Sequence, residues 1–413
     1  MTATTAALLA NAMKVRYSKG FGPGLAMKSP LIAFFTTNSS EPFDGYSWQH
    51  TYRINEHAGA SEFGAALDAR MALTYPRATI TRSKDYVIVS CDLEAIAATE
   101  GKGGGALVNL LDESVSTAQK GMALSIEAML TGEGGGARGV LNANPIANTI
   151  VLADTTKVRF FRKGLVCQFS NDDGTGAGHA LRDGGNTNTV TAVNEATGTV
   201  TFADNFAVNL PSVVAGDFIF RRSDFDQGAQ RILQGPFAWC PQTAPTFGVD
   251  NFFSMDRGED VALLAGSRLD ASGMTTLDAI GLACTYIQNV DGMADSVLIS
   301  PTRAQEIIDY GIATQEFSEK TSYIGVDLKG IAVRTAMGTL KLIVSPAIPS
   351  SKMLVTRREA WEMRHVRQFP FVVNDGGSAW KLEETADAMQ MRLQYYAQLA
   401  HLKPENTCHV YWT

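Results

Sequence analysis

The stretch ALVNLLDESVSTAQKGMALSIEAML, residues 106–130, carries the strongest structural signal in this chain of 413 residues. Its main apolar residues are spaced by 4, 3, 4, 4 and 3 positions: Leu111, Val115, Ala118, Met122, Ile126 and Met129. That spacing places them on one face of an α-helix. At 1.5 Å per residue the helix is on the order of 37 Å long. The glycine-rich run GEGGGARG, which starts at Gly132, ends it.

Two segments before this helix have the composition of strands. YSWQHTYRI (46–54) and ATITRSKDYVIVSCD (78–92) are rich in aromatic and β-branched residues. About 20 residues without strong periodicity separate them, so we predict a long protruding hairpin; compact domains seldom keep such a loop unless it is functional. The first 45 residues predict an extended arm with one short strand in PLIAFFTTNSS (30–40).

The segment that follows the glycine-rich run is rich in β-structure signals. Between residues 149 and 222, short Val/Thr/Phe runs alternate with Asn/Asp/Gly turns such as NDDGTGAG and RDGGNTN. Strands at this spacing are typical of a small all-β module. The stretch from there to residue 273 is rich in loops.

The remaining part of the chain mixes helices and strands. Apolar residues spaced by 3, 4 and 3 positions predict a second helix over 277–287. SVLIS (296–300) predicts a strand, and PTRAQEIIDYG (301–311) a helix with Ser300 as its N-cap. Near the end, alternating apolar residues predict a long half-buried strand: Met389, Met391, Leu393 and Tyr395.

Composition excludes several classes of protein. With 45% hydrophobic and 19% charged residues, the chain forms a real core and is not disordered over most of its length. It has no run of about 20 apolar residues, so we expect no membrane span. A net charge of −7 gives no basic footprint for sequence-specific nucleic-acid binding. The five cysteines lie far apart, which fits buried thiols in a reducing cytoplasm.

The motifs that would carry chemistry are absent or misplaced in the sequence. Gly134, Gly136 and Gly139 spell GxGxxG, but they follow a helix, where the dipole is wrong for a phosphate, so we predict a structural turn. DRGED (256–260) is interpreted as a loop. Cys408 and His409 are adjacent and, in a strand, point to opposite faces. The sequence therefore predicts no catalytic residue, no cofactor and no metal site.

The order of arm, hairpin, long helix, mixed domain and returning strand resembles the major capsid proteins of tailed bacteriophages. Their fold is the Hong Kong 97-like capsid fold, which encapsulins share. Four stretches carry the resemblance: GEGGGARGVLN (132–142), SVLISPTRAQEI (296–307), LKGIAVRT (328–335) and YAQLAHLKPENTCHV (396–410). They occur in the family's order along nearly the whole chain.

The resemblance implies an α+β fold with a defined division of the chain. Its parts are an N-terminal arm (1–45), an extended loop hairpin (46–92), a peripheral domain with a spine helix (93–148), an inserted small all-β domain (149–223), an axial domain (224–357) and a return to the peripheral domain (358–413). The inserted domain departs from the minimal family pattern, and the sequence does not define its position or role.

The resemblance also implies a function and partners. We expect a structural protein, not an enzyme, that assembles through pentamers and hexamers into an icosahedral shell around double-stranded phage DNA. The shell would form in the bacterial host cytoplasm and remain in the virion, with a separate scaffolding protein, a portal and a decoration protein as partners. Glu62, Asp68 and Arg70 near the loop tip are candidates for ion pairs between subunits. The alternatives are an encapsulin-like compartment shell, or an α/β enzyme or ligand-binding protein with an unrecognised site.

Overall fold

The computed structural model describes the larger part of the chain. The described residues are 29–36, 43, 45–54, 74–93, 104–310, 315–317, 321–323, 326–328, 331–366, 371–372, 380–383 and 387–413. Most of the predicted arm and the predicted loop tip, with Glu62, Asp68 and Arg70, lie outside them.

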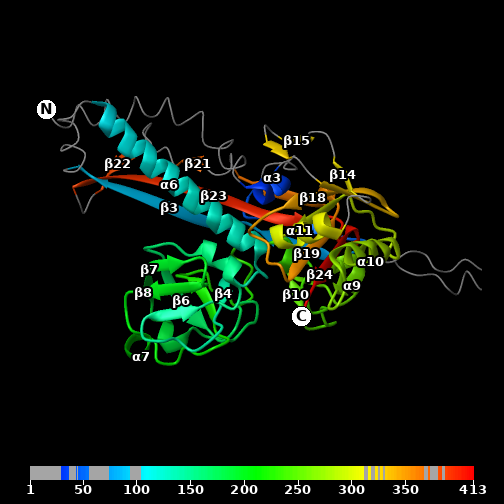
Figure 1. Ribbon diagram of the computed structural model, residues 1–413, viewed down its shortest axis with the longest axis horizontal. Helices are drawn as coiled ribbons and strands as arrows, with labels where there is room; N and C mark the ends of the chain where they lie inside the picture. The colour runs from blue at the N-terminus through cyan, green and yellow to red at the C-terminus, as the bar shows by residue number, and fades with distance from the viewer. Residues whose placement is uncertain are drawn as a thin grey trace, which may run out of the picture.

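A long helix and a two-stranded ribbon form the spine of the molecule (Figure 1). The helix is α6 (Gly104–Thr131), as predicted, and it runs along β3 (Ser83–Asp92) and β23 (Ala388–His401). The two strands pair antiparallel from Ser83 opposite Ala397 to Asp92 opposite Ala388. We call this pair the ribbon. Met389, Met391, Leu393 and Tyr395 are buried, which confirms the predicted alternation. Beyond them, β23 is buried on both faces and pairs with β20 (Trp361–His365).

The predicted strand over 78–92 is interrupted at Arg82. It forms β2 (Arg77–Thr81), which pairs with β1 (Ser47–Thr51), and then β3, which pairs with β23. The buried positions change from even, at Ala78 and Ile80, to odd, at Ser83 and Cys91. A change of parity requires a break in a strand, because its side chains alternate between two faces.

The strand predicted within PLIAFFTTNSS is wrong, because this segment forms the helix α3 (Pro30–Thr36). Ser29 precedes it and accepts a hydrogen bond at Oγ from the backbone N–H of Ile32 (3.3 Å), and Pro30 occupies the first helical position. All residues from Leu31 to Phe35 are buried, and the Phe35 ring packs edge-on against Trp361, 5.6 Å between centroids. Burial on all sides, which gives no period, explains why the apolar run was mistaken for a strand.

A small all-β module, called the β-module below, lies on one side of α6 (Figure 1). Its six-stranded sheet has the order β4-β9-β6-β7-β8-β5, and its residues are β4 (Ala137–Val140), β5 (Thr149–Val151), β6 (Val166–Ser170), β7 (Asn188–Asn194), β8 (Thr199–Phe202) and β9 (Phe218–Arg221). The module also contains the short helix α7 (Phe206–Asn209). Because β4 is one of its strands, the sheet begins before residue 149, where the sequence placed the boundary.

A seven-stranded mixed sheet forms the second large unit, at the other end of α6 from the helix start (Figure 1). Its order is β12 (Ser267–Asp270), β24 (Thr407–Tyr411), β19 (Lys352–Thr356), β13 (Ser296–Ile299), β18 (Gly338–Val344), β17 (Ile331–Thr335) and β14 (Gln315–Phe317). The predicted helices appear as α10 (Thr276–Gln288) and α11 (Pro301–Tyr310). β24 belongs to this sheet and lies within 358–413, the segment predicted to return to the peripheral domain.

Short elements connect these units. They are α8 (Pro236–Trp239), α9 (Val261–Ala265), β10 (Asn251–Phe252), β11 (Met255–Asp256), β15 (Thr321–Tyr323), β16 (Val326–Leu328), β21 (Phe371–Val372) and β22 (Trp380–Leu382). Within the described residues, every helix is too short or too polar to cross a bilayer.

A cluster of buried and partly buried charges joins the ribbon, α6 and the β-module. We call it the junction cluster: Asp85 of β3, Ser125 of α6, Arg138 of β4, Arg221 of β9, and Asp224. Arg221 donates to Asp85 (2.7 Å) and Asp224 (2.8 Å). Arg138 donates to Asp224 (3.2 Å) and Ser125 (3.0 Å), and Ser125 donates to Asp85 (3.1 Å). Burial alone would lower the pKa of Arg221, but the two carboxylates outweigh it and raise that pKa.

Removing one charge of the junction cluster is expected to destabilise the protein strongly. Arg221→Met leaves Asp85 and Asp224 with less positive charge in a buried site, which costs about 3–5 kcal/mol. The control is Arg162→Met, because the Arg162–Glu195 pair is more than half exposed and such pairs contribute less than about 1 kcal/mol. The free energy of unfolding, measured by chemical denaturation, checks this. Equal losses in the two variants would contradict it.

Two buried histidines, His401 at the end of β23 and His409 in β24, make specific contacts with neighbouring elements. The His401 ring stacks on Trp361 with centroids 3.7 Å apart, and its Nε2 lies 2.9 Å from Thr407 Oγ1. His409 donates through Nδ1 to the carbonyl oxygen of Cys240 (2.8 Å). Burial, reinforced by the Lys352 ammonium, lowers the pKa of His409 to about 3. Burial also lowers the pKa of His401 well below its usual value.

Because of these two histidines, we expect the free energy of unfolding to decrease at acidic pH. Both are neutral in the fold but protonate in the unfolded chain below the usual histidine pKa of 6.5. Their contribution to the free energy of unfolding is complete above pH 6.5. It declines between pH 6.5 and about 3, by up to about 1.4 kcal/mol per pH unit for each histidine. His409→Asn keeps a donor toward Cys240 and is expected to reduce this slope. Denaturation curves at several pH values measure it, with His179→Asn, a partly exposed position, as control. An unchanged slope in His409→Asn would count against this assignment.

Candidate assembly surfaces

The glycine-rich run after α6 is a packed turn, as predicted. Gly134 and Gly136 have φ values of 100° and 93°, which favour glycine. A Cβ atom at Gly136 would lie 2.0 Å from the backbone oxygen of Asp224, and one at Gly135 would lie 2.0 Å from that of Asp173. The glycines therefore allow the backbone of the turn to meet two other loops closely, and they leave no space there for a phosphate.

The acidic and sulfur-containing residues considered in the sequence have structural partners. Asp260 accepts a hydrogen bond from the backbone N–H of Leu263 and caps α9, and Asp256 accepts from those of Gly248 and Gly258. All five cysteines are buried. Burial raises the pKa of Cys167 to about 12, so its thiol is a poor nucleophile. In the described part of the chain, no three His, Cys, Asp or Glu side chains are grouped to hold a metal ion.

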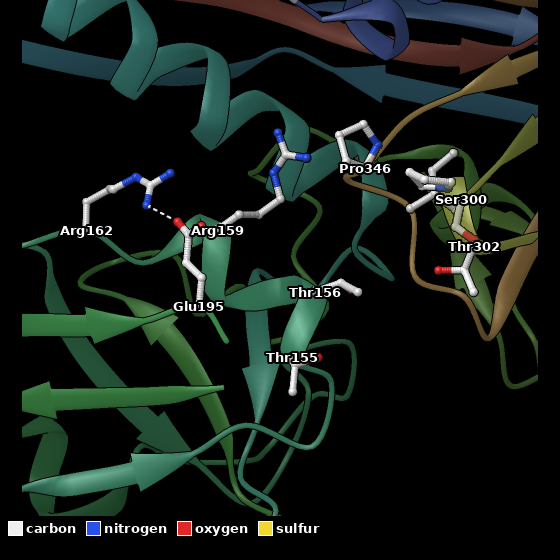
Figure 2. Close-up of a pocket in the computed structure, with 10 residues that line it drawn as sticks. Thr155, Thr156, Arg159, Arg162, Glu195, Ser300, Thr302 and Pro346 are labelled. Carbon is white, nitrogen blue, oxygen red and sulfur yellow. Dashed lines mark hydrogen bonds and ion pairs between the residues drawn. The ribbon is translucent and has the colours of Figure 1, made fainter. Parts of the chain in front are cut away.

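A cleft of about 500 Å³ separates the β-module from the start of α11 (Figure 2). Its two arginines are already paired: Arg162 with Glu195 and Arg159 with Glu127, both at 2.9 Å. The other lining residues are uncharged: Thr155, Thr156, Ser300, Pro301, Thr302, Pro346 and Ile348. The lining lacks the paired nucleophile and base that covalent catalysis requires.

A larger cleft, of about 760 Å³, lies beside α8 and the turn after α6. Asp226 accepts a hydrogen bond from the backbone N–H of Arg231 (2.9 Å), and Asp173 accepts one from that of Thr175 (2.8 Å). Arg257 donates to two backbone carbonyl oxygens, and Glu133 pairs with Lys352. These charged side chains hold loops in place, which favours a structural cleft over a ligand site.

The outer face of the ribbon is exposed and partly apolar. Lys84, Tyr86, Ile88 and Ser90 alternate along β3 and point away from α6, because Val87 and Val89 pack into the core on the other side. Ile88 is 55% exposed and lies opposite Arg392, which is exposed on β23. Tyr86 is 43% exposed, and its hydroxyl lies 2.6 Å from that of Tyr396. We call Lys84, Tyr86, Ile88, Ser90, Gln390, Arg392 and Tyr396 the ribbon face. The exposed Tyr86 and Ile88 side chains among polar neighbours make the ribbon face a candidate contact surface.

The base of the predicted hairpin is anchored firmly to the molecule. The Tyr52 hydroxyl donates to the carbonyl oxygen of His401 (2.6 Å), and the backbone N–H of Thr79 donates to that of Phe253 (2.7 Å). Tyr46 and Tyr75, which flank β1 and β2, are more than half exposed. A two-stranded ladder is marginally stable by itself, so this anchoring is what makes the base a defined platform.

A third exposed surface is the loop around Phe247. Phe247 and Val249 are each 70% exposed, although the loop is held by hydrogen bonds from the backbone N–H groups of Thr246 and Gly248 to Asp250 and Asp256. Sequence reasoning missed both this loop and the ribbon face. The available signal for the ribbon face was the alternation over 83–92, with Tyr86 and Ile88 on the face opposite Val87 and Val89.

Comparison with known proteins gave matches among solved structures alone. No protein-family model and no curated protein sequence matches the chain. A chain of the Cyanophage A-1(L) capsid asymmetric unit is 8% identical, with a TM-score of 0.49, over 93% of each chain. The capsid structure of Cyanophage P-SCSP1u gives 10% identity and a TM-score of 0.38 over 92% of this chain and 87% of that one. A virus-like particle from Pyrococcus furiosus matches 35% of this chain and 54% of its own, with 11% identity and a TM-score of 0.23.

The two cyanophage matches extend over nearly the whole chain, with TM-scores below 0.5. The described elements follow the order that the sequence analysis assigned to the Hong Kong 97-like fold: hairpin strands, spine helix, mixed sheet and returning strand. At these identities and TM-scores the comparison assigns no role to any residue of this chain.

Proposed function

We propose that this chain is the major structural subunit of a phage capsid. Copies of it assemble through pentamers and hexamers into an icosahedral shell that encloses double-stranded DNA. The observation that carries the proposal is the ribbon face, a strip with Tyr86 and Ile88 exposed on a ribbon whose other face is packed against α6. A single subunit leaves these two apolar side chains in water, which favours a contact with another copy there.

The arrangement of the other surfaces favours assembly over catalysis. The anchored base of the hairpin and the Phe247 loop also expose large apolar side chains, whereas both clefts have their charged side chains engaged within the protein. A repeated contact need not be strong, because closed symmetry multiplies it. Glu62, Asp68 and Arg70 are proposed to add ion pairs between subunits, each weak where it is exposed.

The proposal includes partners and a location. The net charge of the chain, −7, suits a shell wall that encloses DNA without binding it tightly. Assembly in the bacterial host cytoplasm with a separate scaffolding protein, followed by a place in the virion beside a portal and a decoration protein, completes the proposal. The alternative from the same fold, an encapsulin-like compartment, would enclose proteins and not DNA.

Sedimentation of the purified chain, with negative-stain electron microscopy of the fastest fraction, tests this function. We expect rings of five or six subunits, or closed shells. Particles from producing cells that protect DNA from nuclease would support the phage capsid, and particles filled with protein would favour the compartment. A chain that stays small even with its scaffolding partner and a crowding agent would overturn the proposal.

A charge placed on the ribbon face is expected to prevent assembly without unfolding the subunit. Ile88→Asp puts a carboxylate into a surface that a neighbour covers, so the fast-sedimenting fraction should fall about tenfold or more, equivalent to about 1.4 kcal/mol. Unfolding free energy should change by less than about 0.5 kcal/mol, because Ile88 is exposed. Ile88→Val is the matched control and should assemble normally. Normal assembly of Ile88→Asp would remove the ribbon face from the interface.

A further inference from the structure

The free end of the β-module is built from two adjacent loops. Residues 142–148 and 203–216, which we call the module tip, lie at the end of the module that is remote from α6 (Figure 1). Backbone N–H groups of Phe206 and Gly216 donate to the carbonyl oxygens of Ala147 (2.8 Å) and Leu141 (2.9 Å). The backbone N–H of Ala215 donates to Asn144 Oδ1 (2.8 Å). The two loops therefore form one surface.

The module tip exposes apolar side chains on a rigid support. Val208 is 83% exposed and Ile146 is 76% exposed. The short helix that carries Val208 is capped by Asn205, whose side chain accepts from the backbone N–H of Ala207 (3.0 Å). Beneath it, Phe206 packs edge-on against Phe202 with ring centroids 5.3 Å apart. The exposure of these side chains is thus a fixed property of the fold.

The module tip is almost free of charge. Asp204 is the sole charged residue in its two segments, in a chain with 42 acidic and 35 basic residues. Asp183, outside the two segments, borders the tip and accepts a hydrogen bond from the backbone N–H of Ser212 (3.3 Å). With so few charges, a highly charged partner would lose more hydration there than it could recover in ion pairs. This composition favours an apolar partner surface with few charges. Because the chain carries a net charge of −7, two copies repel each other least where they meet through such surfaces.

We propose that the module tip is a contact between two copies of this chain, in which the tip of one β-module packs against the tip of another. An isologous contact of this kind needs a self-complementary surface, and an uncharged apolar surface satisfies that condition. The contact rests on the proposed shell, because two short loops alone offer few apolar side chains compared with the 800 Å² or so per partner that a stable interface buries. In a shell, the tips of neighbouring copies are held close together, so their effective concentration is high. A contact that is weak between free subunits can then form.

Single cysteines at the module tip test this contact in the full chain. Ile146→Cys, Ala207→Cys and Val208→Cys are made separately and oxidised mildly, and the particle and unassembled fractions are run on a non-reducing gel. The native cysteines do not interfere, because all five are buried. Ala196→Cys is the matched control, since Ala196 is exposed in the turn between β7 and β8, at the opposite end of that hairpin from Phe202.

We expect disulfide-linked dimers of this chain in the particle fraction for at least one tip variant, about tenfold or more above the control because of the high local concentration. Tip variants that cross-link no more than Ala196→Cys in intact particles would overturn the contact and leave the shell unaffected. A cross-link to a different protein would overturn it as well. If wild-type chains form no particles, the shell proposal fails, and this contact, too small to act alone, fails with it.

Discussion

The ion pairs of Arg221 with the partly buried Asp85 and the buried Asp224 are the constraint on which the arrangement of this protein depends. Moving the β-module relative to the ribbon would break the Arg221–Asp85 ion pair while Arg221 and Asp224 stayed paired within the module, and breaking a shielded ion pair is costly because a partly buried charge loses its partner. Because Ser125 and Arg138 join the same cluster, α6 is fixed as well. Two exposed surfaces far apart, the ribbon face and the module tip, thereby keep one relative orientation.

The charged groups that determine the fold and the apolar groups available for contact occupy different places. In both clefts, arginines and carboxylates bond to each other or to backbone groups of the same chain. Large apolar side chains such as Ile88, Val208 and Phe247 point outward from well-supported elements. A protein that acts on a small molecule needs the reverse, with uncommitted polar groups inside a pocket. This distribution is why the proposed function is structural.

Elements defined by local spacing were predictable from the sequence. The helices α6 and α11 were found because their apolar residues recur with the helical period or their caps are recognisable. Elements defined by distant contacts were not. The apolar run Leu31–Phe35 is helical because Ser29 caps it and Trp361 covers it, and β24 joins the mixed sheet through pairing with β19. Neither interaction leaves a period in the sequence.

The sequence predicted a surface for contacts between subunits, and its named residues stay a prediction. A hairpin that needs neighbours was inferred, but Glu62, Asp68 and Arg70 lie outside the described residues. Among the described residues, the ribbon face on β3 is exposed. There Tyr86 and Ile88 alternate with Val87 and Val89, which pack into the core. Which of two similar apolar rows faces α6 depends on the pairing of β3 with β23, hundreds of residues away. Spacing alone does not contain that choice.

The antiparallel pairing of β3 with β23 also has a mechanical consequence. The hydrogen bonds of an antiparallel pair lie perpendicular to the strands, and here they extend without interruption from Ser83 to Asp92. A pull along the ribbon axis therefore loads all of them in shear at once, whereas a force that peels one strand away would break them one after another. A container under internal pressure stretches its wall in the plane of the wall. Subunits whose ribbons lie in that plane would meet such tension in their most resistant direction.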